Sequence, residues 1–265
     1  MKDWFRSLPV ITKYWFVMTV ICTFSANLGL INPATLIFDW SSFRYKFEIW
    51  RIITPFCFMG AFSFQTLIGM YQLVTYSQRY EVGGPYNTGA GGGTADYAFM
   101  MMLCATSILL INVFYFGRPM LLAGALSFSV LYVWSKREPT AQVAIFGFPL
   151  KAQILPFALT GLNLCMGNPI IDGLLGIGVG HLYYFVAEIV PALYGRDILH
   201  TPDFLVGYFG TGVYVPPVPT AAQQRFPGPG RVNSPSGGAR PVGGSSSSSG
   251  GGGYSWGTGQ TLGSN

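Results

Sequence analysis

The chain has 265 residues, of which 50% are hydrophobic and only 9% are charged. Soluble globular domains carry about 25% charged residues, so this composition excludes an ordinary soluble protein. The formal net charge of +5 is small and spread along the chain, and we therefore expect no nucleic-acid partner.

Six apolar segments approach or reach the roughly 20 residues that a helix needs to cross a bilayer. They lie at residues 14–31, 57–77, 97–117, 119–135, 152–167 and 170–190. A chain in lipid must satisfy its backbone hydrogen bonds internally, so we predict an all-α membrane protein with six transmembrane helices in one bundle. The fourth and fifth segments are short, and short spans must thin the bilayer or hide their ends in protein.

Positive charges predict the orientation of these segments. If the N-terminus is cytosolic, eleven Lys and Arg residues lie on the cytosolic side and four on the other. The four are Arg44, Lys46, Arg51 and Arg118. Because cytosolic loops carry the excess of Lys and Arg, we expect both termini in the cytosol.

The first loop, residues 32–55, mixes six aromatic side chains with charged ones. This composition is typical of an element that lies in the membrane interface. The loop closes with Glu48, Trp50 and Arg51. Trp prefers the headgroup level, and Arg can anchor there to carbonyls or phosphates. An ordinary interfacial anchor would contain the same residues, so both interpretations stay open.

Polar side chains recur inside the apolar segments. Gln65 and Gln72 are seven residues apart and therefore share one helix face. Further polar residues on later segments are Asn112, Asn163, Asn168, Asp172, His181 and Glu188. Polar groups are costly in hydrocarbon and therefore suggest function. We take Gln65, Gln72, Asn112, Asn163 and His181 as candidates for lining a hydrophilic groove, with helix-to-helix hydrogen bonding as the alternative.

The four cysteines predict no metal site. Cys22, Cys57, Cys104 and Cys165 lie in or at the edge of apolar segments and lack metal-ligand spacing. Buried thiols of this kind behave as small hydrophobic side chains. We expect neither a metal nor another cofactor.

The sixth segment contains Gly176 and Gly180, followed directly by His181. Four-residue spacing places both glycines on one helix face, where a neighbouring backbone can approach closely. A histidine beside serines also raises the possibility of nucleophilic catalysis, which requires a hydroxyl within hydrogen-bond reach of a base. The candidate serines are Ser127 and Ser129 on the fourth segment.

Rhomboid proteases place the serine in Gly-x-Ser-Gly and the histidine three residues before the first glycine of Gly-x-x-x-Gly. Neither Ser127 nor Ser129 stands in such a turn, and the residue three before Gly176 is Gly173. We therefore predict no proteolysis. A serine protease that uses Ser127 or Ser129 with His181 is the alternative.

Beyond the apolar segments the composition changes. We divide the chain into a membrane domain (1–195), a juxtamembrane segment (196–215) and a tail (216–265). The tail is rich in Pro, Gly and Ser and cannot bury enough apolar surface to fold, so we predict a disordered cytosolic tail. Aromatic residues and a leucine return in residues 254–263, which is typical of a short binding motif.

Four short motifs together identify a family. They are residues 48–56 (EIWRIITPF), 93–97 (GTADY), 132–137 (YVWSKR) and 175–185 (LGIGVGHLYYF). In this order and spacing the chain, from about Trp4 to Tyr194, resembles the Derlin family. Derlins are rhomboid-like pseudoproteases of endoplasmic-reticulum-associated degradation.

The resemblance implies a rhomboid-like fold of six transmembrane helices in the endoplasmic reticulum membrane, with cytosolic termini and no protease activity. Trp50-Arg51 matches the family's Trp-Arg motif, and Gly176 with Gly180 matches its Gly-x-x-x-Gly motif. The family needs both motifs for retrotranslocation. It also implies partnership with misfolded client proteins, a membrane ubiquitin-ligase complex and the lipid bilayer. The residues do not distinguish a monomer from a homo-oligomer.

The end of the tail resembles the SHP box that recruits the Cdc48-type (valosin-containing) AAA+ ATPase. The matching residues are Trp256, Gly257, Gly259, Leu262 and Gly263. Thr261 departs from the pattern, because a basic residue usually precedes the leucine. The leading hypothesis is a non-catalytic retrotranslocation component that binds misfolded proteins, thins the membrane and passes clients to this ATPase. A quality-control adaptor that does not conduct substrate is a further alternative.

Overall fold

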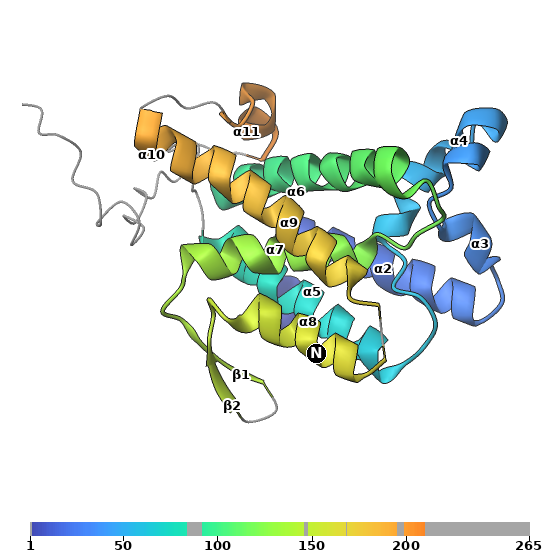
Figure 1. Ribbon diagram of the computed structural model, residues 1–265, viewed down its shortest axis with the longest axis horizontal. Helices are drawn as coiled ribbons and strands as arrows, with labels where there is room; N and C mark the ends of the chain where they lie inside the picture. The colour runs from blue at the N-terminus through green and yellow to red at the C-terminus, as the bar shows by residue number, and fades with distance from the viewer. Residues whose placement is uncertain (1, 84–91, 146–147, 168, 195–198, 210–265) are drawn as a thin grey trace, which may run out of the picture. The chain divides into compact units, whose positions relative to one another are not determined.

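The computed structural model describes residues 2–83, 92–145, 148–167, 169–194 and 199–209. Six helices overlap the six segments expected from the sequence (Figure 1). They are α2 (Val10–Asn27), α5 (Phe64–Gly83), α6 (Gly92–Ile111), α7 (Ala123–Arg137), α8 (Leu155–Cys165) and α9 (Ile171–Tyr184). All of the expected tail (216–265), with its ATPase-binding motif, lies outside the described residues.

Two of these helices continue beyond their regular α-helical part. A π-helical turn, η3 (Asn112–Phe116), extends α6, and a second one, η4 (Phe185–Ile189), leads from α9 into α10 (Val190–Tyr194). The resulting helices, Gly93–Phe116 and Ile171–Tyr194, are both apolar and long enough to cross a membrane. Within the described residues, these two helices have the length and the apolar composition that a membrane-spanning helix needs.

The helix α7 lies at the centre of the bundle. It contacts α5, α6, α8 and α9, which surround it in Figure 1. Thirteen of its 15 residues are buried, including Trp134 and the charged Arg137. A helix that is covered on every side packs against protein rather than lipid. The fourth segment can therefore be short, because neighbouring helices cover both its length and its ends.

The helix α5, which corresponds to the second predicted segment, begins at Phe64 instead of residue 57. The backbone conformation just before it explains the difference. Gly60 has a backbone φ of +89°, which no right-handed helix contains. The Asn27 side chain holds this turn by donating to the Gly60 carbonyl and accepting from the Phe62 amide, at 3.1 and 2.9 Å.

The first loop folds into four short elements, α3 (Pro33–Leu36), α4 (Trp40–Lys46), η1 (Ile49–Ile52) and η2 (Thr54–Phe56). Asp39 caps α4, because its carboxylate accepts hydrogen bonds from the backbone amides of Ser41 and Ser42. The Ser42 hydroxyl, more than any other contact, holds the pKa of Asp39 below its usual value. Tyr45 and Phe47 leave 78% and 79% of their surface exposed, so the loop presents an apolar outer face.

The expectation of an entirely helical fold was wrong in one place. Strands β1 (Gln142–Ile145) and β2 (Phe148–Lys151) form an antiparallel hairpin between α7 and α8. Pro149 pairs with Ala144 in this hairpin. A proline is tolerated there because each strand of a two-stranded sheet is an edge strand. Two helical pieces complete the described chain, α1 (Lys2–Ser7) and α11 (Asp203–Phe209), and α11 packs on α6.

Candidate functional site

A polar cavity of about 310 Å³ lies where the starts of α5, α7 and α9 meet the end of α8. It contains three of the five groove candidates, Gln65, Gln72 and Asn163. Ser127 from α7 and Asp172 from α9 add a hydroxyl and a carboxylate. The cavity therefore gathers hydrogen-bonding groups from four helices at one end of the bundle.

Local helix geometry explains how these side chains converge. Gln65 and Gln72 share one face of α5, as their seven-residue spacing predicts. Asp172 lies in the first turn of α9, where the positive end of the helix dipole favours a carboxylate. It packs against Gly124 of α7, where an added Cβ would lie 3.4 Å from the Asp172 Oδ2.

Sequence reasoning missed Ser63 and Thr66, which also line the cavity. The Ser63 hydroxyl accepts from the Thr66 amide at 3.2 Å, and the Thr66 hydroxyl donates to the Ala61 carbonyl at 2.6 Å. Together these bonds begin α5 with a side-chain cap. The available signal was the Ser-x-x-Thr spacing directly before the apolar run.

Two groove candidates lie elsewhere, which corrects the expectation that all five line one groove. His181 is nine residues beyond Asp172 on α9, about 13 Å along the helix axis. It is exposed, and its Nδ1 lies 2.8 Å from the Tyr132 hydroxyl. Asn112 is buried at the start of η3, and its side-chain nitrogen has no hydrogen-bond partner among the described residues. No residue of α6 or η3 lines the polar cavity.

The serines and the histidine form no catalytic pair in the part of the chain that the structure describes. The Ser127 hydroxyl donates to the Ala123 carbonyl at 2.9 Å. The Ser129 hydroxyl is within reach of two carbonyls, those of Ala125 at 3.0 Å and Gly176 at 2.9 Å. Both hydroxyls are thus engaged with backbone, and the imidazole of His181 is engaged with Tyr132.

The helices α7 and α9 touch along Gly176 and Gly180. A Cβ added at Gly176 would lie only 2.3 Å from the Ala125 carbonyl oxygen. At Gly180 it would lie 3.0 Å from the Ser129 carbonyl oxygen. These neighbours are backbone atoms and cannot rotate away, so the two helices need glycine at this seam.

Trp50 and Arg51 face opposite ways. Arg51 is 6% exposed, and its Nη1 donates to the carbonyls of Ala34 and Ile37, each at 2.7 Å. Its Nε donates to the Glu48 carboxylate. Ala34 lies within the four-residue α3 and Ile37 directly follows it, so the guanidinium satisfies carbonyls that so short a helix leaves unpaired. Trp50 instead exposes 53% of its surface. Arg51 holds the loop together, and Trp50 points away from it.

A second polar cluster lies at the opposite end of the same helices. The Glu81 carboxylate near the end of α5 accepts from the amides of Ile11 and Thr12, at 3.1 and 2.9 Å, and from the Thr12 hydroxyl at 2.8 Å. These amides begin α2 and lack partners within their own helix. The carboxylate of α5 therefore caps α2, and the dipole of α2 stabilises its charge.

Further contacts extend this cluster across the bundle. Arg137 at the end of α7 donates to Glu188 on η4 and to the Tyr80 hydroxyl on α5. The Thr201 hydroxyl donates to the Asp96 carboxylate at 2.7 Å and thereby ties the segment before α11 to α6. Glu188 belonged to the polar residues noted in the sequence, but the pairing partners were not predicted.

The described chain is a mostly helical membrane protein with polar groups gathered inside the bundle. Comparison with known proteins identifies the family to which it belongs. The model of the Der1-like family matches residues 8–203. Human Derlin-1 is 38% identical over 231 residues, which cover 84% of this chain and 89% of that protein. Derlin-1 of Arabidopsis thaliana is 33% identical over 232 residues, covering 86% and 85%. The chain belongs to the Der1-like family.

Proposed function

We propose that this protein is a non-catalytic retrotranslocation component of endoplasmic-reticulum-associated degradation. It crosses the endoplasmic reticulum membrane six times with both termini in the cytosol. It binds misfolded proteins and lowers the barrier to their passage through the membrane. The membership in the Der1-like family and the polar cavity of the bundle support this proposal.

The polar cavity is the observation that carries the proposal. A polypeptide in hydrocarbon leaves peptide groups without hydrogen-bond partners, each at a cost of several kcal/mol. Side chains such as Gln65, Gln72, Asn163 and Asp172 offer such partners. In the proposed topology, the cavity opens at the lumenal end of the bundle, where clients arrive.

A second contribution is a thinner bilayer. The helix α8, which forms one wall of the cavity, has 11 residues and therefore a length of about 16 Å. The hydrocarbon core of a typical bilayer is about 30 Å thick. The exposed aromatic side chains of the first loop, Trp50 among them, would hold this loop in the membrane interface.

The pulling force would come from the Cdc48-type ATPase, recruited by Trp256, Gly257, Gly259, Leu262 and Gly263 of the tail. A membrane ubiquitin ligase would mark the clients. Deleting residues 254–265 should leave client binding intact and stop client release. A tail deletion that releases clients at the normal rate would remove the ATPase from the proposal.

The proposal is tested by client turnover in cells that lack their own Derlins. Trp50→Ala should stabilise a misfolded client while the bundle stays folded. Phe114→Ala, which removes an exposed aromatic side chain outside this loop, is the matched control. Normal turnover with a well-expressed Trp50→Ala variant would rule out this role for the loop.

A separate assay tests the absence of catalysis. Purified protein is incubated with a helical membrane substrate, alongside Ser127→Ala and Ser129→Ala variants. We expect no cleavage by any of them. Cleavage that disappears in a serine variant would instead identify an intramembrane protease.

A further inference from the structure

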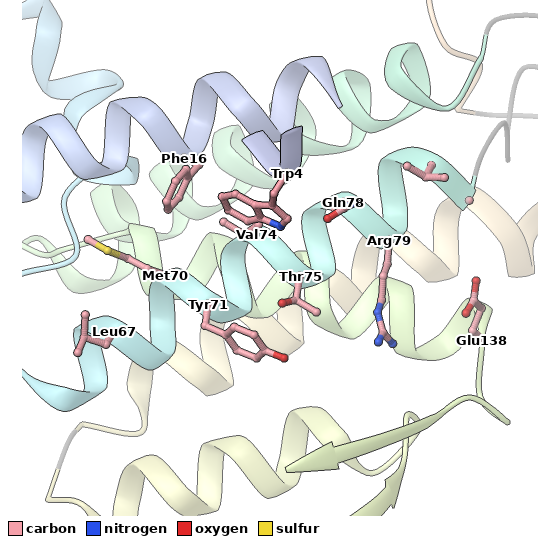
Figure 2. Close-up of a pocket in the computed structure, with 12 residues that line it drawn as sticks. Trp4, Phe16, Leu67, Met70, Tyr71, Val74, Thr75, Gln78, Arg79 and Glu138 are labelled. Atoms are coloured by element: carbon pink, nitrogen blue, oxygen red, sulfur yellow. The ribbon is translucent and has the colours of Figure 1, made fainter. Parts of the chain in front are cut away.

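An elongated groove of about 840 Å³ runs along α5 and shares no lining residue with the polar cavity. Figure 2 shows it between α1 and α2 on one side and the end of α7 on the other. The α5 residues that line it recur at intervals of three and four, from Leu67 to Val82. This stretch of helix is about 22 Å long, which is most of the thickness of a bilayer core.

The groove changes character along its length. Leu67, Met70 and Val74 make one end apolar, and Trp4 and Phe16 form its wall. The other end carries Thr75 and Gln78 together with two charged residues, Arg79 from α5 and Glu138 after α7. Polar groups thus gather at the end of the groove that the proposed topology places at the cytosolic surface.

The two charges at this end are available to a ligand. Arg79 and Glu138 are both exposed, and neither takes part in an ion pair within the described chain. The Arg79 guanidinium lies over the Trp134 ring, 5.0 Å from its centroid. This contact fixes the guanidinium but uses none of its five N–H donors.

We propose that the groove binds a zwitterionic phospholipid. One acyl chain lies along α5 between Leu67 and Val74. The phosphate accepts hydrogen bonds from Arg79, since a guanidinium matches phosphate in a bidentate way. The ammonium of a choline or ethanolamine headgroup faces Glu138. A lipid with a second negative charge in place of the ammonium would be repelled by that carboxylate, so the charge pair selects neutral headgroups.

Photolabelling tests the site directly and independently of client degradation. The full chain is reconstituted in nanodiscs with a trace of phosphatidylcholine that carries a photoreactive acyl chain, and the labelled peptides are mapped. We expect label on α5 between Leu67 and Val74. Unlabelled phosphatidylcholine should compete, whereas phosphatidic acid and glycerophosphocholine, which lacks acyl chains, should not.

Variants identify the headgroup contacts. Arg79→Gln should reduce labelling about fivefold, the effect of losing one favourable phosphate contact near the membrane surface. Arg79→Lys should retain part of it. Glu138→Gln should let phosphatidic acid compete. Arg44→Gln removes another exposed arginine that lies over an aromatic ring, and it should change nothing.

Leu67→Trp tests the apolar end of the groove, with Leu110→Trp on α6 as the matched exposed control. The first should reduce the labelling and the second should not. The proposal fails if Arg79→Gln and Leu67→Trp both label like the unmodified chain. It also fails if phosphatidic acid competes as well as phosphatidylcholine.

Discussion

The two ends of the bundle use buried polar residues in opposite ways. At the end that includes Glu81 and Arg137, carboxylates, hydroxyls and a guanidinium engage one another or backbone amides. At the other end, Gln65, Asn163 and Asp172 surround an open cavity. Both sets occur in apolar segments and cannot be told apart by composition. Paired groups join helices, and groups around a cavity remain available to a ligand.

Removing the ion pair between Arg137 and Glu188 should have the largest effect on the stability of the bundle. The Arg137 side chain is fully buried, so Arg137→Leu leaves Glu188 without its partner. Removing one member of a buried ion pair typically costs about 3–5 kcal/mol, and the partial exposure of Glu188 favours the lower part of this range. Thermal unfolding in detergent should show the loss, whereas Lys136→Leu should lose at most the contact of its ammonium with the Tyr132 ring, worth about 0.5–1 kcal/mol. Equal stability of the two variants would mean that the pairing does not hold the bundle.

The glycine seam connects the two ends and should be the next most sensitive region. Gly176→Ala forces a methyl group against the Ala125 carbonyl and should cost about 3 kcal/mol, the upper part of the range for overpacking. Gly180→Ala meets a looser contact and should cost less. Gly178 has no neighbour within 4 Å, so Gly178→Ala is the matched control. Equal melting temperatures for all three would contradict the close approach of α7 and α9.

The two residues of the Trp-Arg motif should differ in their effects: Arg51 stabilises the loop, whereas Trp50 is proposed to act in client turnover. Arg51→Gln removes charge-assisted hydrogen bonds to the Ala34 and Ile37 carbonyls and should destabilise the loop by about 2 kcal/mol. Trp50→Ala should change stability by less than about 0.5 kcal/mol, because its side chain is largely exposed. Limited proteolysis of the loop should therefore be faster in the Arg51 variant only. Faster cleavage in both variants would show that Trp50 is structural too.

The cap of α4 should produce a smaller, pH-dependent effect. The pKa of Asp39 is lower in the folded chain, chiefly because of the Ser42 hydroxyl bond. The ionised cap therefore stabilises the loop above the unfolded value of about 3.9 and is lost as the pH falls through the folded pKa. The protection of the Ser41 and Ser42 amides against hydrogen exchange, measured relative to the intrinsic exchange rate at each pH, should fall as the pH drops through the folded pKa. Asp39→Asn keeps a cap without a charge and should remove this pH dependence.

The sequence predicts the approximate positions of six of the described helices, because apolar length indicates which long segments can be buried. It predicts their ends less well, since the start of α5 depends on the backbone of Gly60 and its contact with Asn27. The β1–β2 hairpin was missed because its strands are short and stand next to an apolar run.

Part of the site was also predictable. Gln65 and Gln72 share a face through helix periodicity alone. The partners of the other polar residues depend on packing between distant segments, as in the Thr201–Asp96 bond across 105 residues. Periodicity within one helix carries no information on such contacts, so it could not show that His181 and Asn112 lie away from the polar cavity.

The most direct test of the account asks whether a client polypeptide enters the polar cavity. A photoreactive amino acid is placed at Gln65 or Asn163 of the cavity, at the exposed Leu193 of α10, and at Leu110 on the outer face of α6. Clients are held in transit by an inhibited ATPase and then irradiated. The account predicts crosslinks from Gln65 and Asn163, and none from Leu193 or Leu110. Clients that crosslink equally at all four positions, or only outside the cavity, would contradict it.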